Sequence, residues 1–321
     1  MYYYNTLFVI VKFYAWLWWL HSALLHDTVC MLNEALQHSK PVTIDAKPLF
    51  DKYLSQFPPT VSELTFTNIL CWTEVKHHLY CEYEEHLLIS FRDDRNRLNF
   101  FAPIGPHPEK IMNKPFSGDH PYLWSRISEH LAHSVSRNSH PVYDRKNSDY
   151  VYNLSALRTL EGKKYDGKRN FIKRCSKLSP IVQPLTKEDV AACLQIQEQW
   201  LETQRGNPSA KNESTALMKA LQYFDVLPLH GIGIFIEDTL AGFAIGEPLN
   251  ARTFVEHFEK GLPQFTGIYA FLLQAFAQSI PDTFTHLNRE QDIGIEGIRT
   301  SKESWNPEYL ERKYTVRMQC A

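Results

Sequence analysis

The spacing of apolar residues changes along the chain, and the change predicts helices followed by strands. Helical spacing over 49–57, ahead of a Pro-Pro pair, predicts one helix, and the capping-box sequence at 60–63 predicts the start of another. From Leu79 the period shortens to that of strands, and polar turns separate the segments. Helical spacing returns near 122–134. The segments with strand spacing are 79–83, 87–91 and 98–104.

A similar order recurs in the second half of the chain. A second capping box, Thr186–Asp189, opens a predicted helix whose apolar residues repeat as far as Leu201. Three strand segments follow, at 232–236, 240–246 and 252–259. Helices before a three-stranded meander, found twice, predict an α+β protein with an internal duplication. We therefore expect a hydrophobic extension over 1–30, a first domain over 31–178 and a second over 179–321, which carries the site.

The first thirty residues depart from this pattern. Residues 7–25 are almost all apolar or aromatic on every side of a helix, interrupted by Lys12, His21 and Ser22. The length approaches that of a membrane span, but a lysine within a span costs about 2.5–3.5 kcal/mol on insertion scales. Three interpretations stay open: a dispensable extension before a domain that begins at Met31, a membrane anchor, or a packed helix.

Composition narrows the class of protein. Hydrophobic residues make up 44% of the 321 and charged residues 22%, with a net charge of -2, as in an ordinary globular protein. This balance argues against a surface that coats nucleic acid generally. The six cysteines include no Cys-x-x-Cys pair, which fits reduced thiols and no metal site. We expect a cytoplasmic protein, with membrane contact only through residues 7–25.

One segment is nevertheless strongly basic. Residues 158–177 hold eight basic side chains against Glu161 and Asp166. They form either a solvated helix face or a contact surface for phosphates or an RNA backbone, and both interpretations stay open. Tyr165 and Phe171 could stack on bases there, although each is more often a packing residue. The basic residues are Arg158, Lys163, Lys164, Lys168, Arg169, Lys173, Arg174 and Lys177.

Polar residues replace the apolar strand that an α/β domain should have after the predicted helix at 268–276. Asn288, Glu290 and Asp292 occupy every second position, so on a strand they point the same way, while Arg289 points the other way. Polar groups this dense beside a core helix need partners. The segment is therefore either an exposed edge strand or the floor of a binding site.

The strand at 252–259 and the loop after it carry further candidates. Regular alternation puts His257 and Glu259 on one side of the strand, where they could transfer a proton or lie on an exposed face. Next come Gln264 and Gly267, ahead of a helix. The stretch is similar to the start of the Gln/Arg-x-x-Gly-x-Gly/Ala pyrophosphate loop of GNAT acyltransferases, but Tyr269 occupies the last position, which argues against coenzyme A.

Three groups of residues together resemble a known family. They are the segment 149–170 with its Lys168-Arg-Asn170, the segment 257–260, and Asn288-Arg-Glu-Gln-Asp-Ile-Gly with Lys302. Over about 40–316 the chain is similar to the family of the phosphatidylglycerol lysyltransferase C-terminal domain. The resemblance implies two tandem GNAT-like domains and transfer of an aminoacyl group from a charged tRNA. The acceptor stays open among a small molecule, a lipid and a peptide.

Acyl transfer requires an acceptor that loses a proton and donors for the oxyanion. We expect Glu259 or His257 to transfer the proton, and Glu290 and Asp292 to bind the amine of a cationic donor. No cofactor is required beyond the donor, aminoacyl-tRNA or acetyl-coenzyme A. An acetyltransferase and a catalytically silent GNAT-like binding module are the alternatives. The expected substrate contacts are Arg289, Lys260 and Lys302 for phosphates, with Lys168, Arg169, Asn170, Gln264, Gly267 and Asn288.

Overall fold

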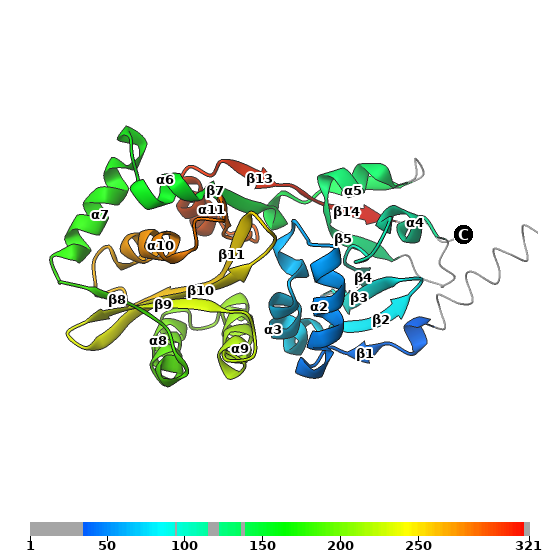
Figure 1. Ribbon diagram of the computed structural model, residues 1–321, viewed down its shortest axis with the longest axis horizontal. Helices are drawn as coiled ribbons and strands as arrows, with labels where there is room; N and C mark the ends of the chain where they lie inside the picture. Colours follow the sequence, from blue (N-terminus) through cyan, green and yellow to red (C-terminus); the bar gives the residue numbers. More distant parts are fainter. Residues whose placement is uncertain (1–34, 94, 115–121, 136–138, 318–321) are drawn as a thin grey trace, which may run out of the picture.

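The computed structural model describes residues 35–93, 95–114, 122–135 and 139–317. The expectations about residues 1–30, including the segment 7–25, lie outside these ranges. Across the part that is described, no helix has both the length and the apolar character needed to cross a bilayer. Figure 1 shows two sheet-and-helix units side by side.

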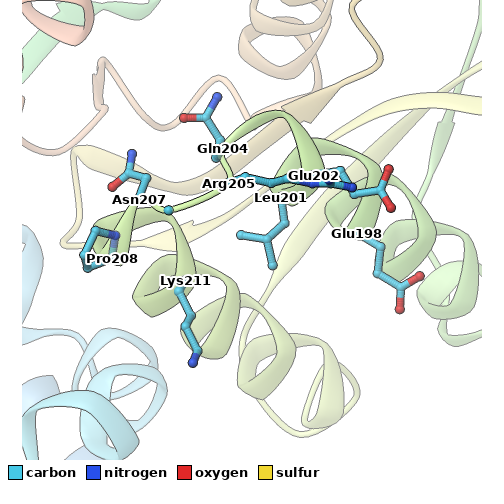
Figure 2. Close-up of a pocket in the computed structure, with 9 residues that line it drawn as sticks. Glu198, Leu201, Glu202, Gln204, Arg205, Asn207, Pro208 and Lys211 are labelled. Carbon is cyan, nitrogen blue, oxygen red and sulfur yellow. The ribbon is translucent and has the colours of Figure 1, made fainter.

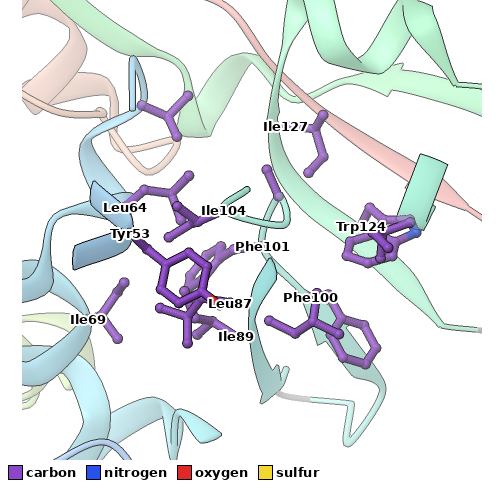
Figure 3. Close-up of a cluster of buried hydrophobic side chains, with 14 of the residues drawn as sticks. Tyr53, Leu64, Ile69, Leu87, Ile89, Phe100, Phe101, Ile104, Trp124 and Ile127 are labelled. Atoms are coloured by element: carbon purple, nitrogen blue, oxygen red, sulfur yellow. The ribbon is translucent and has the colours of Figure 1, made fainter. Parts of the chain in front are cut away.

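The first unit is built on a sheet with the strand order β1-β2-β3-β4-β5-β14-β6, in which β4 and β5 are parallel. Its core lies between the sheet and helices α2 and α3, around residues such as Tyr53, Ile69 and Leu87 (Figure 3). The bounds are β1 (Lys40–Pro41), α2 (Lys47–Gln56), α3 (Phe66–Lys76), β2 (Leu79–Tyr83), β3 (His86–Arg92), β4 (Leu98–Phe100), α4 (Pro108–Met112), β5 (Leu123–Ser128), α5 (Glu129–Ser134), β6 (His140–Tyr143) and β14 (Lys313–Arg317).

The second unit has the strand order β13-β7-β12-β11-β10-β9-β8, with α8 and α9 on one face and α6, α7 and α10 on the other (Figure 1). Its first half runs β7 (Asp149–Asn153), α6 (Leu154–Thr159), α7 (Asp166–Ser176), β8 (Ile181–Pro184), α8 (Val190–Thr203) and α9 (Pro208–Gln222). Then come β9 (His230–Ile236), β10 (Thr239–Pro248), β11 (Thr253–Gly261), α10 (Ile268–Ser279), β12 (His286–Asn288), α11 (Glu296–Glu303) and β13 (Tyr309–Glu311).

The predicted α+β fold class is confirmed: the chain forms two units, each with a mixed, mostly antiparallel sheet flanked by helices. The second meander is found as predicted, with β9, β10 and β11 paired antiparallel in sequence order. The helix expected near 122–134 is wrong for its first half. Leu123–Ser128 is a strand, held between β4 and β14, and the short helix α5 follows it. The partner of β5, strand β14, comes from the C-terminal end of the described chain. The spacing of apolar residues within 122–134 cannot predict such a distant partner.

The chain crosses between the two sheets more than once. The segment 149–178, expected in the first domain, contributes strand β7 to the second sheet, and α6 and α7 pack against α10 there. In return, the C-terminal strand β14 pairs in the first sheet with β5 and β6. The first domain is therefore the first sheet with its helices, β14 included, and the second domain is 149–311. The pairing partners decide this division, and they are distant in sequence.

Strand β11 organises the site because it has two irregularities. It pairs in parallel with β12 only over Thr253–Val255, and then continues alone on that side to Gly261. On its other side a bulge in the pairing with β10 leaves one extra residue between Glu256 and Phe258. The two parallel strands therefore separate where the bulge reverses the direction of the side chains.

Candidate functional site

A buried arginine occupies the space where β11 and β12 separate. Arg289 follows the end of β12 and donates from Nε to Glu256 and from Nη2 to Glu259, both at 2.5 Å. Only 9% of Arg289 is exposed, and the two carboxylates raise its pKa against the effect of burial. Each carboxylate keeps a second oxygen, Oε1, that is buried and has no hydrogen-bond partner among the described residues.

The bulge explains why one arginine contacts two residues that are three apart. On a regular strand Glu256 and Glu259 would point to opposite faces. The same irregularity places Phe254 and Phe258 in different hydrophobic clusters, although alternation puts them on one face. The expectation that His257 and Glu259 share one side is therefore wrong, since His257 has a separate set of partners. A bulge leaves no signal in a period-2 pattern.

His257 lies between two carboxylates. Its Nδ1 is 2.8 Å from Oε1 of Glu290, and its Nε2 is 2.9 Å from Oε1 of Glu247. Burial by itself would lower the pKa of His257, but the hydrogen bonds and charges of Glu247 and Glu290 outweigh it and raise the pKa to about 10. The ring is then an imidazolium that donates from both nitrogens. A ring in this state has no free nitrogen with which to accept a proton.

The first domain completes this arrangement through two consecutive residues of α3. Thr67 donates to Oε2 of Glu247 at 2.9 Å, and Asn68 donates to Oε1 of Glu290 at 3.0 Å. The hydrogen bonds form a closed ring that joins the two domains through His257. Glu290 also has a positive φ of 55°, which a glutamate rarely adopts, so the ring holds a strained backbone in place.

Asp292 lies at the centre of a separate cationic cluster. Its carboxylate accepts hydrogen bonds from Arg145 and Arg299, from the hydroxyl of Tyr150 and from the backbone N–H of Gly294. These donors, led by Arg299, outweigh burial and lower the pKa of Asp292 to about 2. The carboxylate has as many donors as it can accept. The arrangement therefore suits the holding of the 289–299 loop rather than contact with an amine.

Two further residues of the family motif, Asn288 and Lys302, have different surroundings. Asn288 is fully buried and donates to Asp149 at 2.9 Å, so it supports β7. Lys302 is partly buried, bonds to the backbone carbonyl of Arg289 and has no carboxylate within ion-pair distance in the described chain. Burial, with the nearby charge of Arg289, lowers the pKa of Lys302 to about 8. Lys302 is therefore a cation that gives up its proton readily.

Lys260 lies on the opposite face of the sheet from Arg289. It is buried, pairs with Glu213 of α9 at 2.6 Å, and its Nζ lies 3.6 Å from the ring centroid of Trp200 on α8. These contacts fasten α8 and α9 to the end of β11. Lys260 therefore has an internal partner where the sequence suggests a phosphate contact.

The loop before α10 has a packing reason for its glycine. Gly267 has a φ of 92°, and a Cβ atom there would lie 2.1 Å from the carbonyl oxygen of Phe171 on α7. Helix α7 thus covers the point at which a pyrophosphate would approach the backbone. Tyr269 donates to the carbonyl of Gly261 at 3.1 Å, and Gln264 is exposed.

Three cations of the basic segment are engaged internally. Arg158 donates to the backbone carbonyls of Ala277 and Ile280 and pairs with Asp282 at 2.7 Å. Lys168 bonds to Ser304 and lies 4.3 Å from the ring centroid of Trp305. Arg169 donates to the carbonyl of Gly162 at 3.0 Å and also bonds to Leu160 and Asp166. Other residues of the segment are exposed, among them Asn170, Phe171, Lys173 and Arg174 of α7 and Lys177 just after it.

Sequence reasoning missed several residues of the site. Glu256 and Glu247 look like ordinary strand positions, and Asn68 and Arg145 come from distant segments. No local signal distinguishes Glu256, because the same strand also carries His257, Glu259 and Lys260. Among the described residues no group of three or more His, Cys, Asp or Glu side chains is arranged to hold a metal ion.

Comparison with solved structures places this fold among known proteins. A conserved protein of unknown function from Bacteroides thetaiotaomicron is 25% identical with a TM-score of 0.81, and the match covers 88% of this chain and 99% of that one. The C-terminal domain of a putative lysylphosphatidylglycerol synthetase from Agrobacterium fabrum has a TM-score of 0.58 at 10% identity, covering 85% and 92%. The L-PGS structure from Bacillus licheniformis has a TM-score of 0.56 at 13% identity, covering 84% and 90%.

Sequence comparison agrees with the structural likeness. An uncharacterized protein of Mycoplasmoides gallisepticum is 26% identical over 187 residues, which are 56% of this chain and 59% of that protein. The match therefore spans less than two thirds of that relative. The family model described as "Phosphatidylglycerol lysyltransferase, C-terminal" matches residues 55–317. The chain belongs to the family of the phosphatidylglycerol lysyltransferase C-terminal domain.

Proposed function

We propose that this protein is an aminoacyltransferase that moves an aminoacyl group from a charged tRNA to an acceptor, in the space between β11 and β12. The family and the GNAT-like fold relate the chain to acyltransferases. The arrangement around Arg289 carries the finer proposal. It offers carboxylate oxygens that could bind an amine, a carboxylate that could accept a proton (Glu259) and an ammonium that could donate one (Lys302).

The observation that supports an amine-bearing donor is the pair of unpartnered oxygens. Oε1 of Glu256 and Oε1 of Glu259 are buried and accept no hydrogen bond from the described residues. A buried carboxylate oxygen without a donor is costly, and an ammonium group supplies charged donors. Only 5% of Glu256 is exposed, and we assign it the donor's α-ammonium. Glu256 takes the amine-binding role that the sequence suggested for Glu290 and Asp292, because those two carboxylates have internal partners.

Glu259 is the group we assign to proton transfer. Burial raises its pKa, the charge of Arg289 lowers it, and that of Glu256 raises it again, which leaves the pKa at about 7. A general base is most effective when its pKa lies near the working pH. His257 has both ring nitrogens engaged, so we do not assign it this role.

The proposed reaction balances without a further reactant. The acceptor's hydroxyl or amine attacks the ester carbonyl of the donor and loses its proton to Glu259. The tetrahedral intermediate then collapses, and the bond between the carbonyl carbon and the ribose oxygen of the tRNA breaks. Lys302, with its lowered pKa, gives that oxygen a proton. Proton transfer from Glu259 to Lys302 restores both groups.

Two features favour tRNA over acetyl-coenzyme A as the donor. Phe171 of α7 packs on Gly267, and Tyr269 crowds the same loop, where a pyrophosphate would need open backbone N–H groups. The exposed cations Lys173, Arg174 and Lys177 offer backbone-phosphate contacts instead. Lys168 and Arg169 have internal partners, so we assign the phosphate contacts to Lys173, Arg174 and Lys177 instead.

A transfer assay tests the proposal. The full-length protein is incubated with tRNAs charged with radiolabelled amino acids and with cell lysate, and the label is followed. We expect labelled product from the wild type, and at least about a hundredfold less from Glu256→Gln and from Glu259→Gln. Glu237→Gln, on the exposed turn between β9 and β10, is the matched control. Turnover of acetyl-coenzyme A with no use of charged tRNA would overturn the proposal, as would full activity in both variants.

A further inference from the structure

A second place in the molecule has the features of a binding site, and it lies outside the space around Arg289. A groove of about 740 Å³ runs along the corner where α8 ends and α9 begins (Figure 2). A volume of this size is typical of sites for small molecules. Leu201 gives the groove an apolar wall.

Charged residues of both signs border this groove. Glu198 and Glu202 come from the end of α8, Arg205 from the turn, and Lys211 from the start of α9. Figure 2 shows the two carboxylates at one side of the view and Lys211 away from them. None of the four makes an ion pair or a side-chain hydrogen bond with any residue that the structure describes. Opposite charges are therefore close to one groove and unpaired.

The same charges oppose the helix dipoles. Glu202 lies in the last turn of α8, whose C-terminal end is already negative, and Glu198 lies one turn earlier on the same side. Lys211 lies in the first turn of α9, whose N-terminal end is already positive. The dipoles would favour the reverse signs at Glu202 and Lys211, and Glu198 repels Glu202 from one turn earlier. Residues that break a local rule without an internal partner are expected where a site needs them.

A buried side chain at this end of α8 also lacks partners. Gln197 is one helical turn before Leu201 and only 2% exposed, and neither its amide nitrogen nor its oxygen has a hydrogen-bond partner in the described chain. Buried amides are nearly always paired. The next residue along the helix face, Trp200, packs on Lys260 at the end of β11.

We propose that this groove binds a small zwitterionic ligand, with its ammonium group against Glu198 and Glu202 and its anionic group against Lys211. The negative end of α8 and the positive end of α9 each strengthen the attraction for the matching charge. The ligand class is that of short peptides and amino compounds that carry a carboxylate or a phosphate. The inference does not depend on the proposed transfer reaction.

Titration calorimetry on the full-length protein tests it, with no donor present. The probes are L-alanyl-L-alanine, its N-acetyl form, its C-terminal amide, and phosphoethanolamine. We expect the dipeptide or phosphoethanolamine to bind, and each probe that lacks one charge to bind at least about tenfold more weakly. Binding of phosphoethanolamine alone would identify the anion as a phosphate, and binding of the dipeptide as a carboxylate.

Charge-neutral variants assign the binding to the groove. We expect Glu198→Gln with Glu202→Gln, and separately Lys211→Gln, to abolish binding while the melting temperature is unchanged or higher. Glu237→Gln with Asp238→Asn, on the turn between β9 and β10, should bind like the wild type. No heat from either zwitterion at millimolar concentration, or unchanged binding in both variants, would overturn the proposal. Neither result bears on aminoacyl transfer, which is measured separately.

Discussion

Nδ2 of Asn68, in the first domain, donates a hydrogen bond of 3.0 Å to Oε1 of Glu290, in the second. The same oxygen accepts from His257, so one carboxylate oxygen joins a helix of one domain to a strand of the other. Together with Thr67 and Glu247, these residues link the two domains through side-chain hydrogen bonds.

Asn68→Ala should therefore change the second domain. Glu290 keeps its bond to His257, so we expect the free energy of unfolding to fall by only about 1 kcal/mol. Transfer activity should fall more than this loss of stability explains, because the left-handed backbone at Glu290 loses one of its constraints. Urea unfolding and the transfer assay measure the two effects. Asn212→Ala, on α9, is the control, and equal activity in both variants would contradict the role of Asn68.

His257 makes stability depend on pH in a defined direction. Its pKa is raised from an ordinary 6.5 to about 10 in the folded protein, so its contribution is complete below pH 6.5 and is lost as the pH rises through 10. Each unit of pKa difference corresponds to about 1.4 kcal/mol. We expect the urea midpoint to fall between pH 7 and 10 in the wild type. His257→Gln should be less stable at pH 7 and show a flatter profile, and an unchanged slope would refute the assignment.

Gly267 tests the packing of α7 on the loop before α10. Gly267→Ala places a Cβ 2.1 Å from the carbonyl oxygen of Phe171 and also requires a positive φ, so we expect a loss of at least about 1 kcal/mol and a lower melting temperature. Gly167→Ala is the matched control. No atom lies within 4 Å of its added Cβ, and an alanine in helix α7 should stabilise by up to about 1 kcal/mol. Equal melting temperatures would show that the two segments do not pack tightly.

Substitution of Lys313 tests whether the pairing of β14 with the first sheet depends on a buried ion pair. Its ammonium is fully buried between Glu63 and Asp149, which raise its pKa against the effect of burial. Lys313→Met leaves two buried carboxylates without it, so we expect a loss of about 3–5 kcal/mol. Its neighbour Arg312 is exposed and paired with Glu129, so we expect Arg312→Met to cause a much smaller loss of stability than Lys313→Met. Similar losses for both would contradict this account of the domain junction.

The sequence predicted local structure well and long-range structure poorly. The meander of β9, β10 and β11 follows from alternation. The polar side chains of Asn288, Arg289 and Asp292 are buried and paired, as their density beside a core helix requires. The domain division could not be predicted, because β7 and β14 find partners far away in sequence.

The roles of individual residues were harder to predict for a related reason. One extra residue in β11 reverses the direction of every side chain after it, so Glu256 joined the site and His257 left the side of Glu259. The candidate carboxylates Glu290 and Asp292 are at the site, but their hydrogen bonds come from Asn68, Arg145 and Arg299. Partners of this kind depend on tertiary structure.

The most direct test of the central claim is the affinity for charged tRNA before and after N-acetylation of its aminoacyl group. Acetylation removes the ammonium that Glu256 is proposed to bind and leaves the tRNA unchanged. We predict that it weakens binding to the wild type at least about tenfold and has little further effect in Glu256→Gln, whose matched control is Glu237→Gln. Equal affinity of the wild type for both forms would contradict the account.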